Sequence, residues 1–222
     1  MNSLNVIRNL KKALESVDDF TAAYLELTRD FFFDRIPVDL QRKLVETAVS
    51  VGREMVGKIV EETGTTNSWC IAEYLGLEIS MVSQENVVGN LLIRSEYIPP
   101  KTIRIYKRSI EQLKEAISRF GLEELFPNEA ILDLHVAHEI FHHLEKTRIG
   151  VLSERYSIER FRFGPLCFKI RVRAISEIAA HTFARTLTSV KVPPSILDYI
   201  ATGNIDNLLA KLAEIKKGVV LL

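Results

Sequence analysis

The sequence contains only two cysteines among its 222 residues, Cys70 and Cys167, and neither belongs to a Cys-x-x-Cys pair. This is too little for a disulfide framework, so we expect a reducing compartment, the cytoplasm. No apolar run approaches the length of a membrane span. The first residues do not show the basic start and apolar stretch of a secretion signal, so we expect none. We therefore predict a cytoplasmic protein that does not enter a membrane.

The chain also carries no net charge, because its 29 Lys and Arg residues balance its 29 Asp and Glu residues. Without a net positive charge we expect no binding to nucleic acid. Residues 146–173 are the local exception, since basic side chains greatly outnumber acidic ones there. This pattern predicts a solvated connection rather than a patch that attracts substrate.

Residues 1–62 show the spacing of apolar side chains that is typical of helices, interrupted at Pro37. The small, polar residues 63–67 then predict a boundary. We expect a helical N-terminal segment at 1–65 and a second domain at 66–222. Within the first segment, the consecutive Phe31, Phe32 and Phe33 predict core packing rather than a binding patch.

The second domain mixes helices and strands, so we predict an α+β fold that is predominantly helical. Apolar alternation predicts strands at 77–82, 87–94 and 102–106, and helical spacing predicts helices at 69–75, 109–120 and 205–217. Asn128 is expected to cap a histidine-rich helix that is apolar around most of its circumference and therefore central. Gly164 and Pro165 predict a break, followed by a further helix that ends near Ser189.

The histidine-rich helix carries the most informative motif of the chain, His138-Glu139-x-x-His142. On a helix this spacing places two imidazoles one turn apart on the same face, with a carboxylate beside them. Two neutral nitrogen ligands and a nearby base are what a catalytic zinc ion requires to activate water. His138 and His142 are the predicted zinc ligands, and Glu139 is the predicted general base.

A catalytic zinc ion takes a third protein ligand, which must come from elsewhere in the chain. Glu177 is the best candidate, because it shares one helix face with small residues that permit close packing against the first helix. Glu145 and His181 remain alternatives. His181, one turn after Glu177, is also expected to orient a zinc-binding histidine from outside the ligand shell. His135 is either a similar outer partner or an ordinary surface residue, and His143 is expected to point away.

Three stretches besides the His138–His142 motif resemble one known family, the ImmA/IrrE metallopeptidases. Residues 177–184, Glu-Ile-Ala-Ala-His-Thr-Phe-Ala, resemble the family's second motif, Glu-x-x-Ala-Asn-x-Phe-Ala, although His181 stands where the family has Asn. Residues 71–79 and 102–106 resemble the elements before the active helix, so the likeness covers about 66–195. It implies a gluzincin-type zinc peptidase with a zincin-like core, in which a small sheet packs on the active-site helix beside a helical N-terminal extension.

These observations predict a zinc-dependent peptidase that hydrolyses peptide bonds by a metal-activated water. The resemblance implies regulatory cleavage of a cytoplasmic protein. The alternative is a non-catalytic regulatory or binding protein with a peptidase-like fold and a structural metal, because His181 as a fourth ligand would close the open position. A di-iron helical bundle is a third hypothesis, since Glu139-x-x-His142 matches half of its motif, but the second half is missing.

Overall fold

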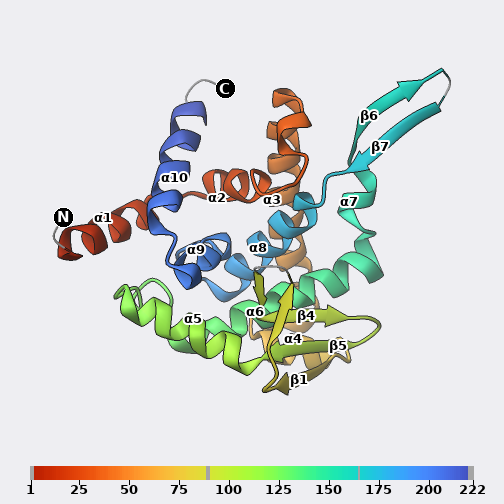
Figure 1. The fold of residues 1–222 in the computed structure, drawn as a ribbon. Helices are drawn as coiled ribbons and strands as arrows, with labels where there is room; N and C mark the ends of the chain where they lie inside the picture. Colours follow the sequence, from red (N-terminus) through yellow and green to blue (C-terminus); the bar gives the residue numbers. More distant parts are fainter. Residues whose placement is uncertain (1–2, 89–90, 165, 220–222) are drawn as a thin grey trace.

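The computed structural model describes residues 3–88, 91–164 and 166–219 (Figure 1). The chain is predominantly helical with a small mixed sheet, which confirms the α+β prediction. None of the helices formed by the described residues is both long enough and apolar enough to cross a lipid bilayer. Cys70 is exposed and carries a free thiol, whereas the side chain of Cys167 lies outside the described part of the chain.

Three helices form the N-terminal part, as predicted: α1 (Ser3–Glu15), α2 (Asp19–Leu27) and α3 (Val38–Thr63). Asp18 accepts a hydrogen bond from the backbone of Thr21 and so caps α2. A short turn, η1 (Phe33–Arg35), leads to Pro37, which precedes α3. Gly64 ends α3 in the left-handed conformation, with φ of 69°, that glycine adopts readily. Phe31 is 91% exposed, so the prediction of core packing is wrong for this residue.

The central sheet has the order β1-β5-β4, with β1 (Glu78–Val82) parallel and β4 (Ser95–Ile98) antiparallel to β5 (Thr102–Tyr106). The predictions of strands at 77–82 and 102–106 are confirmed. Between β1 and β4, β2 (Asn86–Val88) pairs with β3 (Leu91–Ile93). The strand predicted at 87–94 thus corresponds to parts of β2 and β3, and residues 89–90 between them lie outside the described residues. Helix α4 (Ser68–Tyr74) precedes the sheet.

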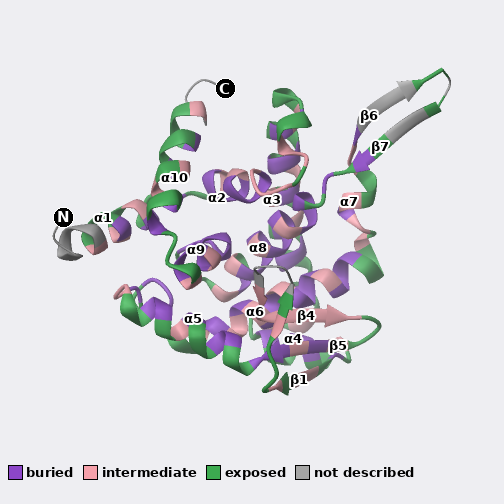
Figure 2. Ribbon diagram, viewed as in Figure 1, coloured by how far each residue is buried: buried purple, intermediate pink, exposed green. Residues whose placement is uncertain are grey.

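The histidine-rich helix is α6 (Asn128–Leu144), which follows α5 (Lys107–Arg119). It packs against β4 and β5 on one side and against a later helix, α8 (Ala174–Thr188), on the other, so its central position is confirmed (Figures 1 and 2). The prediction that Asn128 caps this helix is wrong. Pro127 occupies the N-cap position and Asn128 is the first helical residue. Proline's fixed φ suits an entry into a helix, so no side-chain cap forms here.

Between α6 and α8 the chain forms a turn, η2 (Glu145–Ile149), a short helix, α7 (Leu152–Arg155), and a hairpin of β6 (Ser157–Phe163) and β7 (Leu166–Arg171). The hairpin extends away from the helices (Figure 1). The prediction of a helix after residue 165 is therefore wrong as far as residue 173, because β7 lies there, while the many exposed residues of 146–173 agree with a solvated connection. Ile158 and Ile170 lie opposite each other on the two strands and are both buried where the hairpin joins the body, as cross-strand partners on one face are. After α8 come η3 (Pro194–Ile196), α9 (Leu197–Thr202) and α10 (Ile205–Val219).

One hydrophobic core runs from α1 to α10 through both predicted parts of the chain. The boundary at residue 65 stays a prediction, but α3 packs directly on α8. The closest approach is at Gly52, where an added side-chain carbon would lie 2.6 Å from the carbonyl oxygen of Ala179 and 2.8 Å from Cβ of Thr182. Gly52 therefore lets α3 hold α8 in place, and α8 carries Glu177.

We expect Gly52→Ala to lower the free energy of unfolding by about 1–3 kcal/mol, because the added methyl group forces two packed backbones apart. The matched control is Gly57→Ala on the same helix, where the new methyl group meets open space. That change should stabilise the protein by up to about 1 kcal/mol, since alanine favours helix. Urea unfolding of both variants checks the pair. Stabilisation by both would contradict the close approach of α3 and α8.

Candidate metal centre

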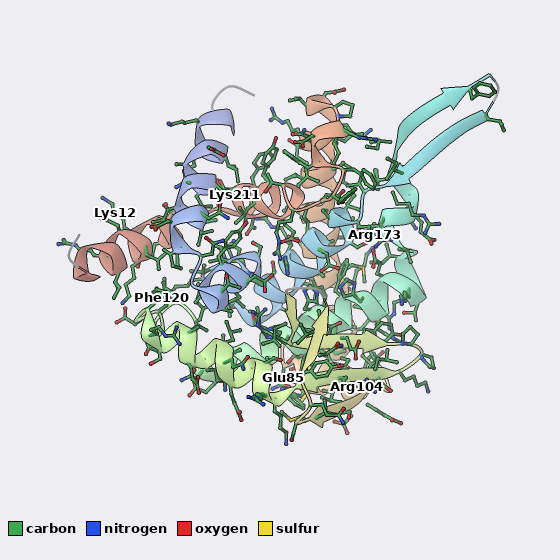
Figure 3. The ribbon with its side chains drawn as sticks, in the orientation of Figure 1. Lys12, Glu85, Arg104, Phe120, Arg173 and Lys211 are labelled. Carbon is green, nitrogen blue, oxygen red and sulfur yellow. The ribbon has the colours of Figure 1, made fainter. Side chains whose placement is uncertain are left out.

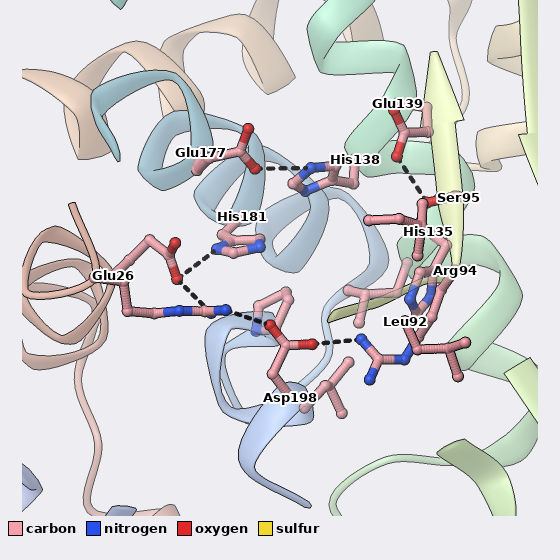
Figure 4. Close-up of a pocket in the computed structure, with 15 residues that line it drawn as sticks. Glu26, Leu92, Arg94, Ser95, His135, His138, Glu139, Glu177, His181 and Asp198 are labelled. Carbon is pink, nitrogen blue, oxygen red and sulfur yellow. Dashed lines mark hydrogen bonds and ion pairs between the residues drawn. The ribbon is translucent and has the colours of Figure 1, made fainter. Parts of the chain in front are cut away.

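The predicted ligands lie on two helices that pack side by side. His138 and His142 are one turn apart on α6. Glu177 and His181 are one turn apart on α8, and Figure 4 shows both beside His138. Ala180 and Ala184 on α8 are fully buried, and α8 packs closely on α6. These small residues therefore allow the approach that was inferred from the sequence.

The three predicted ligands converge on one point. Nε2 of His138 lies 3.1 Å from Nε2 of His142. Oε2 of Glu177 lies 3.4 Å from His138, and Oε1 lies 3.6 Å from Nε2 of His142. Zinc bonds of about 2.0–2.2 Å at tetrahedral angles separate their ligand atoms by roughly 3.3–3.5 Å. The triangle of His138, His142 and Glu177 therefore matches zinc ligands in spacing and in donor type, with a different carboxylate oxygen of Glu177 facing each histidine.

His181 lies beside the same triangle. One atom each from His138, Glu177 and His181 fall within 4.8 Å of one another, and the rings of His138 and His181 are 4.9 Å apart. His138 and Glu177 therefore belong to two candidate ligand sets, one completed by His142 and the other by His181. Nδ1 of His181 is buried without a hydrogen-bond partner and lies 3.9 Å from Oε2 of Glu26 on α2. No described hydrogen bond joins His181 to His138 or His142, so the predicted orienting bond is not seen.

Glu145 orients His142 instead. Its Oε2 lies 3.5 Å from Nδ1 of His142, on the opposite side of the ring from Glu177. The Glu145 carboxylate is buried and also accepts hydrogen bonds from the Ser176 hydroxyl, at 2.6 Å, and from the Leu152 backbone, at 2.8 Å. A carboxylate in this position holds an imidazole with its other nitrogen directed at a metal. Glu145 is therefore an outer partner rather than the third ligand.

The electrostatics of the cluster favour a bound cation. Burial opposes the charged form of His142, but the carboxylates of Glu177, Glu145 and Glu139 raise its pKa to about 9. Burial would raise the pKa of Glu177, yet the imidazoles of His142, His138 and His181 hold it well below its usual range. A proton on His142 thus partly neutralises the negative charge of the surrounding carboxylates. A divalent cation can replace that proton when it binds.

His181 stays neutral beside these groups, because burial, reinforced by His138, lowers its pKa to about 3. Burial likewise lowers the pKa of His135 to about 4. Nδ1 of His135 donates to the carbonyl oxygen of Ile131 at 2.7 Å, and no described hydrogen bond joins His135 to His138 or His142. His143 points away, as predicted. Its ring packs on Tyr97 and its Nδ1 lies 3.0 Å from the Tyr97 hydroxyl.

Glu139, the predicted base, is 4% exposed and faces β4. Its Oε1 accepts a hydrogen bond of 2.7 Å from the Ser95 hydroxyl. Glu139 lines a pocket of about 420 Å³ together with His138, Glu177 and His181. The predicted base and two of the candidate ligands, His138 and Glu177, therefore open into the same space, whereas His142 is not among the residues that line it.

The far wall of this pocket is an ion-pair network that the sequence analysis missed. Asp198 on α9 accepts from Arg29, at 2.6 Å, and from Arg94, at 2.5 Å, and Arg29 also pairs with Glu26 (Figure 4). Burial raises the pKa of Glu26 to about 7 although Arg29 opposes this. Burial would also raise the pKa of Asp198, but Arg94 and Arg29 lower it to about 2. The only sequence signal is the spacing of Glu26 and Arg29 on one helix face.

Comparisons of the chain with protein-family models, with curated proteins and with solved structures return no match.

Proposed function

We propose that this protein is a zinc-dependent peptidase that acts on a protein or peptide substrate. The observation that carries the proposal is the triangle of His138, His142 and Glu177, with distances of 3.1–3.6 Å, together with the buried carboxylate of Glu139, which shares a pocket with His138 and Glu177. The zincin-like core, the likeness to the ImmA/IrrE family and a role in cytoplasmic regulation belong to this proposal. They rest on the motifs of the sequence.

His138, His142 and Glu177 would hold the zinc ion, and the bound ion would supply Lewis acidity that lowers the pKa of water and polarises a carbonyl group. Glu139 takes the proton from the attacking water and passes it to the leaving amine nitrogen. The Ser95 hydroxyl donates a hydrogen bond to Oε1 of Glu139, so Oε2 is the oxygen that accepts that proton. Glu145 fixes the ring of His142 through Nδ1. The proton lost by water thus ends on the new amine, and the hydroxyl group of the water ends on the new carboxyl group.

The purified protein should contain about one zinc ion per chain, because one triangle of ligands fits one ion. A chelator should remove the zinc and stop the cleavage of an unfolded protein substrate, and added zinc should restore cleavage while magnesium should not. Elemental analysis and a gel-based cleavage assay check this. Cleavage that resists chelation, or a protein that binds no zinc, would refute the proposal.

A second candidate is a non-catalytic regulatory protein that uses the same metal for structure. The observation in its favour is the position of His181 within 4.8 Å of His138 and Glu177. Four protein ligands would leave no position for water. X-ray absorption of the zinc-loaded protein counts nitrogen and oxygen neighbours and separates the two candidates.

A further inference from the structure

A second pocket continues from the first on the other side of Glu177. It has a volume of about 820 Å³ and lies between the segment that follows α2 and strand β7. Glu26, Arg29 and Glu177 line both pockets. The two spaces therefore form one groove that passes the candidate metal centre, which is the shape that an extended polypeptide requires.

One wall of the second pocket is the edge of β7. Lys169, Ile170 and Arg171, three successive residues of this strand, all line the pocket. Successive side chains of a strand point to opposite faces, so a groove that meets all three runs along the strand's edge. Among the described residues β7 pairs only with β6, which leaves its other edge open. An open edge presents backbone donors and acceptors that an extended peptide can pair with.

The same wall is positively charged. Lys169, Arg171 and Arg173 are exposed along it, and Arg173 lies at the base of the hairpin (Figure 3). Arg171 pairs at 3.0 Å with Glu154, but both side chains are more than half exposed, so solvent screens this pair. Three acidic residues also line the pocket, and each has partners of its own, Glu177 being paired with His138 and His142. Asp30 accepts from the backbones of Ala174 and Phe32, both at 3.0 Å, and Glu26 pairs with Arg29.

The opposite wall carries an exposed aromatic side chain. Phe31 is 91% exposed, and its ring packs edge-on against Phe32 at 4.9 Å. Both residues line the second pocket. A large apolar side chain held open beside a groove offers a contact for an apolar side chain of a bound chain. The groove thus combines a strand edge, a row of cations and one aromatic contact.

We propose that this groove binds an extended, acidic segment of the polypeptide substrate, which adds as a strand to the edge of β7. Acidic side chains of the segment pair with Lys169 and Arg173, and an apolar side chain packs on Phe31. The inference rests on the proposed peptidase function, because it assigns the substrate class of the same site. It places one flank of the cleaved bond in the second pocket and the other flank in the first.

The test measures binding without cleavage, using the full-length Glu139→Gln protein and fluorescein-labelled peptides. One peptide is rich in glutamate and has a single phenylalanine, and its counterparts carry glutamine or lysine in place of glutamate. We expect the glutamate peptide to bind most tightly and the lysine peptide least. The affinity of the glutamate peptide should fall as salt is added.

Reversing the charges with Lys169→Glu and Arg173→Glu together should weaken binding of the glutamate peptide at least about tenfold. The same double variant should bind the lysine peptide more tightly than its parent does, which a misfolded protein would not do. The matched control reverses Lys107 and Lys114 on α5, at a distance from the hairpin (Figure 1), and should leave both affinities unchanged.

Equal binding of the glutamate and lysine peptides would overturn the inference, as would tighter binding of a labelled single-stranded oligonucleotide than of any peptide. Failure of the peptidase proposal would give a different experimental result. In that case the unmodified protein cleaves none of the peptides with zinc present, although Glu139→Gln still binds the glutamate peptide. Cleavage by the unmodified protein with no preference for acidic flanks would refute the groove alone.

Discussion

Replacing Glu139 with glutamine should lower the rate of peptide hydrolysis by about 10²–10⁴-fold, the usual contribution of a positioned acid–base group. Glutamine has the same shape, and its carbonyl oxygen can still accept the hydrogen bond that Ser95 donates to Oε1. It cannot take a proton from water. The side chain is 4% exposed, so solvent does not easily replace it as a base.

The measurement is the cleavage rate of a fluorogenic peptide, compared with the zinc content of the same preparations. Zinc content should be unchanged, because His138, His142 and Glu177 are intact. Glu129→Gln is the matched control, since it makes the same change in the first turn of α6 at an exposed position. A Glu139→Gln protein that cleaves at the normal rate would show that another group removes the proton.

The sequence predicts those parts of the site that depend on spacing within one helix. His138 and His142 lie four residues apart, as do Glu177 and His181, so each pair shares a face once the helix forms. The small residues of α8 then indicated that the two faces can approach. Because each of these inferences needs only local geometry, a single sequence suffices to propose the triangle.

The rest of the site depends on segments that are distant in the sequence. Glu26, Arg94 and Asp198 lie on α2, next to β4 and on α9, and only the packed core brings them together. The orienting role of Glu145 was also missed, although it stands three residues after His142. Both nitrogens of an imidazole can face a carboxylate, and spacing alone does not say which nitrogen faces Glu145 and which faces Glu177.

The hairpin was missed for a different reason. Its many basic residues indicated a solvated connection, and Gly164 with Pro165 indicated the start of a helix. Gly164, with φ of 57°, instead lies after the end of β6, where a left-handed residue reverses the chain. The charge composition thus hid the strand pattern of the apolar residues, of which Ile158 and Ile170 are buried among the hairpin side chains that the structure describes. The same strand pair supplies the open edge beside the metal centre.

Removing His142 should cost the protein its zinc, whereas removing His181 should not. His142→Ala deletes a corner of the triangle whose edges are 3.1 and 3.6 Å, so we expect zinc affinity to fall by more than about 100-fold, beyond the loss typical of outer partners. His181→Ala deletes a ring outside that triangle, so we expect a loss of no more than about 10–100-fold and cleavage that persists in excess zinc. Competition with a zinc-binding dye measures both affinities.

The reverse result would identify the ligand set as His138, His181 and Glu177, which lie within 4.8 Å of one another. A large loss in both variants would mean four protein ligands. Cobalt in place of zinc then gives an independent reading, because its absorption spectrum reports the coordination number. If four protein donors fill the site, solvent has no position on the ion, and the non-catalytic regulator becomes the better account. If His181→Ala keeps its zinc and its activity, His181 is not a metal ligand. Its role is then its position beside Glu26, whose Oε2 lies 3.9 Å from the Nδ1 that has no hydrogen-bond partner.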